Sequence, residues 1–125
     1  WKSTQPGSKI VLLDVGGVHY KTLRMTLTSV PGSMLEAMFS GRHEARLITD
    51  WEGRVFLDRD GTHFGQILAI LRDHAALEEL TSMSATELRA MRREAGYFGV
   101  EDAIFPSERQ RAADEEEEEE DETDS

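Results

Sequence analysis

The sequence contains no cysteine. Disulfide bonds, zinc sites built from thiolates and thiol nucleophiles are therefore excluded, and the lack of cysteine fits a reducing compartment. No apolar run approaches the ~18 residues that a membrane-spanning helix needs, and the chain does not open with a signal-peptide pattern. We expect a soluble protein of the cytoplasm, with the nucleus as an alternative location.

The sequence also lacks the short patterns that mark common active sites. It contains no G-x-S-x-G, no H-E-x-x-H and no phosphate-binding loop that ends in Gly-Lys-Ser/Thr. The histidines do not pair at i and i+4, so we expect no metal ion and no other cofactor. No basic stripe runs along the chain, which argues against nucleic-acid binding. We expect a protein that is not an enzyme.

Negative charge is concentrated at one end of the chain. Ten acidic residues lie within the last twelve positions, Asp114–Ser125, and removing them changes the net charge from −11 to −1. A block of like charges repels itself and has no apolar surface to bury, so we expect residues 106–125 to form a disordered acidic tail. Two roles stay open for this tail: a solubilising terminus, or a contact for a basic protein partner.

The length of 125 residues suits one folded domain. We expect a flexible segment at residues 1–8, the domain at residues 9–105 and the acidic tail after it. The first residue is Trp1 rather than methionine, so we expect the chain to be a fragment or a processed form.

Two strands and a tight turn are predicted near the start of the domain. The apolar run Ile10–Val15 ends at the pair Gly16-Gly17, a combination that is typical of a strand followed by a turn. The side chains of residues 18–22 then alternate between the two faces expected of a strand. We predict a hairpin here, and a further strand at residues 54–57.

Capping residues predict several short helices. Ser33 and Glu36 form a capping box for a helix that ends at Gly41, and Ser84 and Glu87 repeat the pattern. Thr26 is expected to cap a short helical turn. The apolar face of the helix after Ser84 is predicted to contain Leu88, Met91, Ala95 and Phe98.

The stretch Val55–His63 permits three interpretations because it holds Asp58, Asp60, a glycine and a histidine. An EF-hand calcium loop that starts at Asp58 needs glycine at its sixth position and glutamate at its twelfth, where this chain has His63 and Ala69. A catalytic carboxylate pair needs an activating partner, and the sequence shows none. The third interpretation fits best: a strand ends here and Asp60 caps the next helix.

Four stretches in this order resemble a BTB/POZ domain of the potassium-channel-tetramerisation type. They are LDVGGVHYKT, TLTSVPGSMLEAMFSG, VFLDRDGTHFGQILAILRD and ELRAMRREAGYFGVEDAI. The resemblance implies a mixed α+β fold, with a small three-stranded sheet flanked by short helices. The text around Gly61 is similar to the stand-alone KCTD proteins. The stretch LRDHAALEEL differs from the family's Pro-containing turn, and we expect it to extend the central helix.

The resemblance implies a module that assembles with copies of itself and presents a surface to another protein. KCTD relatives often form pentamers, and many recruit cullin-3 ubiquitin ligase. We therefore expect a substrate adaptor or scaffold of that ligase. The alternative is the cytoplasmic tetramerisation domain of a voltage-gated potassium channel. Many channel domains hold zinc between subunits through cysteines, and the lack of cysteine excludes that site here.

Charged residues at the ends of strands and helices are the candidates for the subunit contact. A ring of like subunits lets an aspartate of one copy meet an arginine of the next, and these charges outnumber the caps that one chain needs. From the residues alone, solvated surface pairs worth ~0–1 kcal/mol each are the simpler interpretation. The resemblance favours the subunit contact. The candidates are Asp14, Asp58, Arg59, Asp60 and Arg72.

The resemblance also implies a partner-binding surface, because the matching Met-Phe pair and the loop after it lie on the docking surface of cullin-binding relatives. The corresponding residues here are Met38, Phe39, Ser40, Gly41 and Arg42. Two interpretations of Phe39 stay open. In one it projects outward as an aromatic anchor for the partner. In the other it closes the core under the loop.

Overall fold

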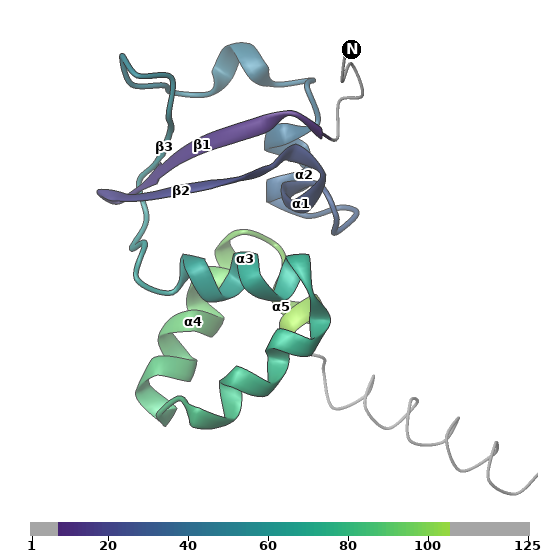
Figure 1. Ribbon diagram of the computed structural model, residues 1–125, viewed down its shortest axis with the longest axis vertical. Helices are drawn as coiled ribbons and strands as arrows, with labels where there is room; N and C mark the ends of the chain where they lie inside the picture. Colours follow the sequence, from purple (N-terminus) through teal and green to yellow (C-terminus); the bar gives the residue numbers. More distant parts are fainter. Residues whose placement is uncertain (1–7, 106–125) are drawn as a thin grey trace, which may run out of the picture.

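The computed structural model describes residues 8–105, and its strands form one small sheet (Figure 1). Strands β1 (Ile10–Val15) and β2 (Val18–Leu23) make an antiparallel hairpin, and β3 (Val55–Leu57) pairs in parallel with β1. The strand order is β2-β1-β3. The predictions made for residues 1–7 and for the acidic tail lie outside the described residues.

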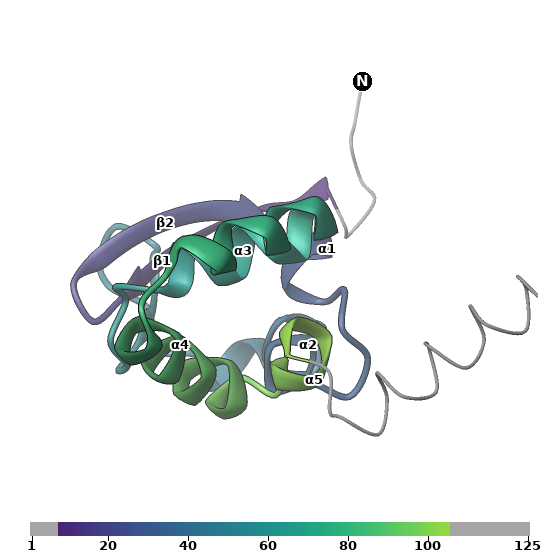
Figure 2. The same cartoon turned by 90° about the horizontal axis from the view of Figure 1, so that it is seen from below.

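Short helices lie beside the sheet, which confirms the predicted α+β class. They are α1 (Arg24–Leu27), α2 (Met34–Phe39), α3 (Phe64–Arg72), α4 (Ala85–Tyr97) and α5 (Glu101–Ile104), with 3-10 segments η2 (Glu44–Arg46) and η3 (His74–Ser82). Figure 2 shows α3 on one side of the molecule and α4, with α2 and α5, on the other. Within residues 8–105, no helix combines the length and the apolar composition that crossing a membrane requires.

Aromatic rings join the sheet to the helices in the core. Phe64 at the start of α3 is fully buried and lies edge-on to Tyr20 of β2 and to Phe98 after α4, with ring centroids 5.4 and 5.1 Å apart. Leu13 and Val15 of β1 are also fully buried. Such rings add ~0.5–1.5 kcal/mol per pair beyond the area they bury, so Phe64 ties three segments together.

The two predicted serine caps are confirmed. The Oγ of Ser33 accepts a hydrogen bond from the amide of Glu36 at 3.0 Å, and the Oγ of Ser84 accepts one from the amide of Glu87 at 3.1 Å. The Ser84 hydroxyl also donates to the Glu87 carboxylate. Each cap satisfies an amide that the helix itself leaves free, and is worth ~1 kcal/mol.

The two other predicted caps are wrong. The α1 helix starts at Arg24, whose amide donates to the Lys9 carbonyl, so β2 runs directly into the helix and Thr26 lies buried within it. The α3 helix starts at Phe64, and its N-cap residue is His63. Asp60 instead closes a turn that precedes this helix. The start of α1 therefore involves a contact 15 residues away in the sequence, whereas the amide of Phe64 at the start of α3 donates to the nearby Gly61 carbonyl.

The central helix does not extend into the stretch after it, contrary to prediction. It ends at Arg72, because Asp73 adopts an extended backbone and its carboxylate accepts a hydrogen bond from the Ala75 amide at 3.0 Å. An aspartate that binds a nearby backbone amide in this way competes with helix continuation. The chain resumes as the 3-10 segment η3, so the turn after the central helix is reshaped rather than replaced by a longer helix.

Candidate protein-interaction surface

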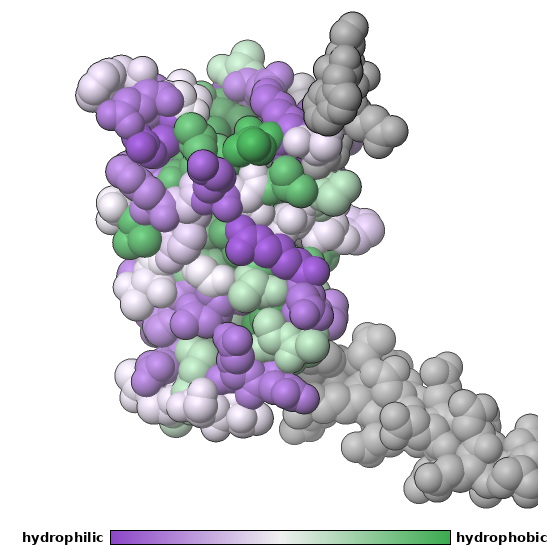
Figure 3. All heavy atoms as spheres, viewed as in Figure 1, coloured by the Kyte–Doolittle hydropathy of each residue, from purple (hydrophilic) through white to green (hydrophobic). Residues whose placement is uncertain are grey.

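The side of the sheet that faces away from the helices carries exposed apolar side chains. Alternate residues of β1 point into the core, so Ile10 and Leu12 point outward. The register places Leu23 opposite Ile10. It places Phe56 beside Asp14, which also points outward, near the C-terminal end of β1. The exposed fractions are 60% for Ile10, 38% for Leu23 and 37% for Phe56. We call Ile10, Leu12, Leu23 and Phe56 the outer sheet face; Figure 3 shows apolar side chains over the sheet.

Asp14 lies on the same outward side of β1. One carboxylate oxygen accepts a hydrogen bond from the Gly17 amide at 2.7 Å, and the other lies 3.8 Å from Nε2 of His19, its cross-strand neighbour. Asp14 therefore stabilises the β1–β2 turn of its own chain. It also borders the outer sheet face, and its part in a subunit contact stays a prediction.

Arg59 binds within its own chain. Its Nε and Nη2 donate to the two carboxylate oxygens of Glu94 at 2.9 and 2.7 Å, and the guanidinium lies 4.2 Å from the centre of the Tyr97 ring. Glu94 is 6% exposed. The hydrogen bond to Glu94 raises the pKa of Arg59. This bidentate ion pair joins the β3–α3 connection to α4.

The remaining predicted interface residues lie near that connection. Asp60 accepts hydrogen bonds from the Thr62 hydroxyl at 2.6 Å and from the Thr62 amide at 3.0 Å, and these bonds lower the pKa of Asp60. Arg72 donates from Nη2 to the Lys21 carbonyl at 3.0 Å, which ties the end of α3 to β2. Asp58 is exposed.

These contacts correct the reasoning behind the predicted interface. Four of the five charged candidates have partners in their own chain, so a surplus of charge does not require a second subunit. The prediction that these residues lie at a subunit contact is untested by the structure. A role of Asp60 in catalysis gains no support, because its carboxylate is engaged by Thr62. Among residues 8–105, no three His, Asp or Glu side chains are grouped to hold a metal ion.

Phe39 is part of the core. Its side chain is 5% exposed at the end of α2, whereas Met34 at the start of the same helix is 38% exposed. Of the two interpretations of Phe39, the outward anchor is therefore wrong and the core residue is right. The reason is the helix phase: Phe39 lies four residues after Leu35, which is fully buried, and so shares its face. The roles of Met38 and Ser40–Arg42 in partner binding remain predictions.

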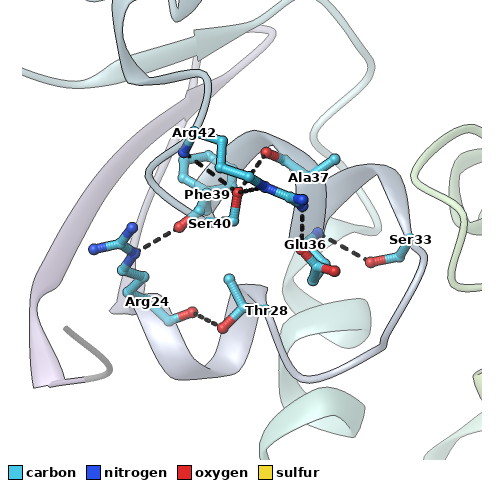
Figure 4. A network of polar contacts seen from close by, with 8 residues as sticks. All are labelled: Arg24, Thr28, Ser33, Glu36, Ala37, Phe39, Ser40 and Arg42. Atoms are coloured by element: carbon cyan, nitrogen blue, oxygen red, sulfur yellow. Dashed lines mark hydrogen bonds and ion pairs between the residues drawn. The ribbon is translucent and has the colours of Figure 1, made fainter.

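A polar network fixes the loop that follows α2 (Figure 4). Arg24 donates from Nε to the Phe39 carbonyl at 2.6 Å, and Arg42 donates from Nε to the Ser40 hydroxyl at 3.0 Å. Arg42 also reaches Glu36, with Nη2 and Oε2 3.3 Å apart. Gly41 has a φ of 95°, and a Cβ atom there would collide with the Arg24 guanidinium. These contacts tie the loop to α1 and to α2.

A cavity of about 280 Å³ opens between α2, β1 and the segment before β3. Of the residues of β1, Leu13–Val15 pair with β3, so the first half of β1 borders the cavity on that side. Arg24 and Gly41 lie in its wall. Its apolar lining includes Ile10, Leu12, Met38, Phe39, Leu47 and Val55. Three of the five predicted partner-binding residues therefore line one cavity, and Phe39 forms its wall rather than a projecting anchor.

Sequence reasoning missed both the outer sheet face and the cavity. The first had a signal, because apolar Ile10 and Leu12 alternate with the core positions of β1 and so cannot also point inward. The cavity had none that we can identify, since its lining comes from segments that are distant in the sequence and meet only in the fold.

Comparison with known proteins agrees with the fold. A family model described as BTB/POZ domain matches residues 11–107. A relative from Arabidopsis thaliana, named FH protein interacting protein FIP2, is 42% identical over 107 residues. The match covers 82% of this chain and 34% of the relative, so the chain spans about a third of that protein. BTB/POZ domains are protein-interaction and oligomerisation modules. This chain belongs to the BTB/POZ domain family, of the potassium-channel-tetramerisation type.

Proposed function

We propose that the chain is the assembly and docking module of an adaptor protein. It forms a closed ring of four or five copies and presents the surface around α2 to a second protein. The proposed partner is cullin-3, so the protein acts as a substrate adaptor or scaffold of a cullin-3 ubiquitin ligase. The adaptor role places it in the cytoplasm, with the nucleus as the alternative.

The outer sheet face is the observation that carries self-association. It gathers four apolar side chains on the outward side of a sheet whose other side already packs the core. Apolar side chains gathered on an open face in this way are typical of interaction sites in soluble proteins. Polar neighbours border it: Asp14, His19 and Lys21 lie on the same side of the sheet. Apolar and polar side chains together are the usual composition of a protein interface.

The fixed loop after α2 supports the docking role. Hydrogen bonds from Arg24 and Arg42 restrain the loop, which reduces the conformational entropy that is lost when a partner orders it. The Arabidopsis relative is named for its interaction with an FH protein, which supports a protein as the ligand of this chain. We also propose that the acidic tail serves either solubility or a basic protein partner.

Two measurements test the proposal. Light scattering on the whole chain, whose protomer mass is 14.1 kDa, is expected to give the mass of four or five copies. Purified cullin-3 is expected to be retained by the immobilised chain and released by competing soluble chain. A monomer at micromolar concentration contradicts the assembly, and a failure to retain cullin-3 contradicts the adaptor role while leaving the scaffold.

The channel alternative rests on the family resemblance alone. It predicts that the reading frame of the gene continues beyond Ser125 into apolar segments of ~20 residues, each long enough to span a membrane. Sequencing a full-length transcript decides between this alternative and the adaptor.

A further inference from the structure

The cavity beside α2 has the size of a side-chain pocket. Its volume is about 280 Å³. A dry cavity of ~150 Å³ is enough to hold benzene, whereas pockets for whole drug-sized ligands span ~300–1,000 Å³. The cavity therefore accommodates one large aliphatic or aromatic side chain with part of its backbone.

The charges in the wall leave one cation without an ionic partner. Lys9 forms an ion pair with Glu44 at 3.1 Å, and Glu52 pairs with Arg54. The hydrogen bond from Lys9 is the main cause of the lowered pKa of Glu44, and Arg24 contributes least to it. No carboxylate among residues 8–105 comes within ion-pair distance of Arg24, whose Nε is occupied by a backbone carbonyl. An incoming carboxylate would supply the missing negative charge.

We infer that this cavity binds a partner protein through one large apolar side chain, and that an acidic residue next to that side chain in the partner meets Arg24. The inference rests on the proposed docking role of the α2 surface and states which chemical groups this surface recognises. Ile10 and Leu12 at the rim belong to the outer sheet face, so the rest of the apolar lining, Met38, Phe39, Leu47 and Val55, holds the side chain. The charge of Arg24 selects which segments fit. The cavity is continuous with the fixed loop Ser40–Arg42, so the same partner contacts both.

Short peptides test the chemistry on the unaltered chain. Nuclear magnetic resonance titration with N-acetyl-Glu-Phe-amide is expected to shift the amide signals of residues 9–12, 38–41 and 47, with a dissociation constant on the order of 1 mM. N-acetyl-Gln-Phe-amide lacks the charge and should bind roughly three- to tenfold more weakly. N-acetyl-Glu-Gly-amide lacks the ring and should not bind. Equal binding of all three peptides, or shifts elsewhere only, overturns the inference.

A matched pair of variants tests the location. Leu47 lines the cavity, and Ile48 beside it is 69% exposed and does not. The substitution Leu47→Trp fills the cavity and should abolish peptide binding, whereas Ile48→Trp should leave it unchanged. Arg24→Gln should remove the difference between the Glu and Gln peptides, and Arg24→Lys should keep it. Undiminished binding to a folded Leu47→Trp chain contradicts the assigned cavity.

The outcomes separate this inference from the proposed function. Peptide binding at the cavity without retention of cullin-3 refutes the adaptor role and supports the inference that the cavity binds an apolar side chain. Retention of cullin-3 that Leu47→Trp does not weaken refutes the pocket as its docking site and keeps the adaptor role.

Discussion

Arg59 illustrates how a charge that seems free in the sequence is used inside the fold. Its guanidinium makes two hydrogen bonds to Glu94, which is almost fully buried, and lies against the Tyr97 ring. Removing only the arginine leaves a buried carboxylate without its partner, and removing one member of a buried pair is costly. Sequence alone could not reveal this pair, because its members are 35 residues apart.

We expect Arg59→Leu to lower the free energy of unfolding by about 2–3 kcal/mol, at the low end for such pairs because Arg59 remains partly exposed to solvent. The double variant Arg59→Leu, Glu94→Leu should recover most of that loss, since no unpaired charge remains. Urea denaturation of the three chains measures both effects. A double variant as unstable as the single one contradicts the account of the pair.

Asp60 and Asp50 are expected to make the stability of the fold depend on pH. The pKa of Asp60 is lowered by the Thr62 hydroxyl, and that of Asp50 by the Arg54 amide. A carboxyl group with a lowered pKa stabilises the fold above its unfolded value of ~3.9 and loses that contribution as the pH falls through the folded value. We expect the melting temperature to fall below about pH 4 and to fall less steeply in Asp60→Ala. If the melting temperatures of the unaltered chain and of Asp60→Ala fall equally steeply with pH, Asp60 does not contribute to this pH dependence.

At the scale of elements, local signals predicted those helix starts that local contacts determine. Ser33 and Ser84 cap their helices through hydrogen bonds that span three residues. Thr26 and Asp60 looked equivalent but are not caps, because α1 starts at Arg24, whose amide donates to the Lys9 carbonyl, and α3 starts only at Phe64. The outer sheet face follows from strand alternation once the core side is known. The cavity depends on packing between distant segments, which no local pattern encodes.

Helix α2 allows a direct comparison of the stability that a buried and an exposed side chain contribute. Phe39 is buried and Met34 is exposed on the same helix. We expect Phe39→Ala to lower the free energy of unfolding by about 3–5 kcal/mol, because it removes a buried ring. Met34→Ala should change it by less than about 1 kcal/mol. Equal effects in thermal or urea denaturation contradict the assignment of Phe39 to the core.

At the scale of the whole molecule, the acidic tail is expected to be dispensable for folding. Deleting Asp114–Ser125 removes ten negative charges and almost no apolar area. The melting temperature should hold or rise slightly, and more so at low salt, because repulsion between like charges is then least screened. A large fall in the melting temperature on deletion refutes this expectation.

The central claim is that copies of the chain assemble through the outer sheet face. Ile10 and Leu23 lie opposite each other there and are largely exposed. The double variant Ile10→Lys, Leu23→Glu places opposite charges across the strands, which preserves the hairpin and removes the apolar surface. Met25→Glu, at an exposed position on α1, is the control.

The deciding measurement is the mass in solution by light scattering, with the melting temperature recorded beside it. We expect four or five copies for the unaltered chain and for Met25→Glu, and a monomer of 14.1 kDa with a nearly unchanged melting temperature for the double variant. A double variant that keeps the full assembled mass, or an unaltered chain that is already monomeric, contradicts the claim.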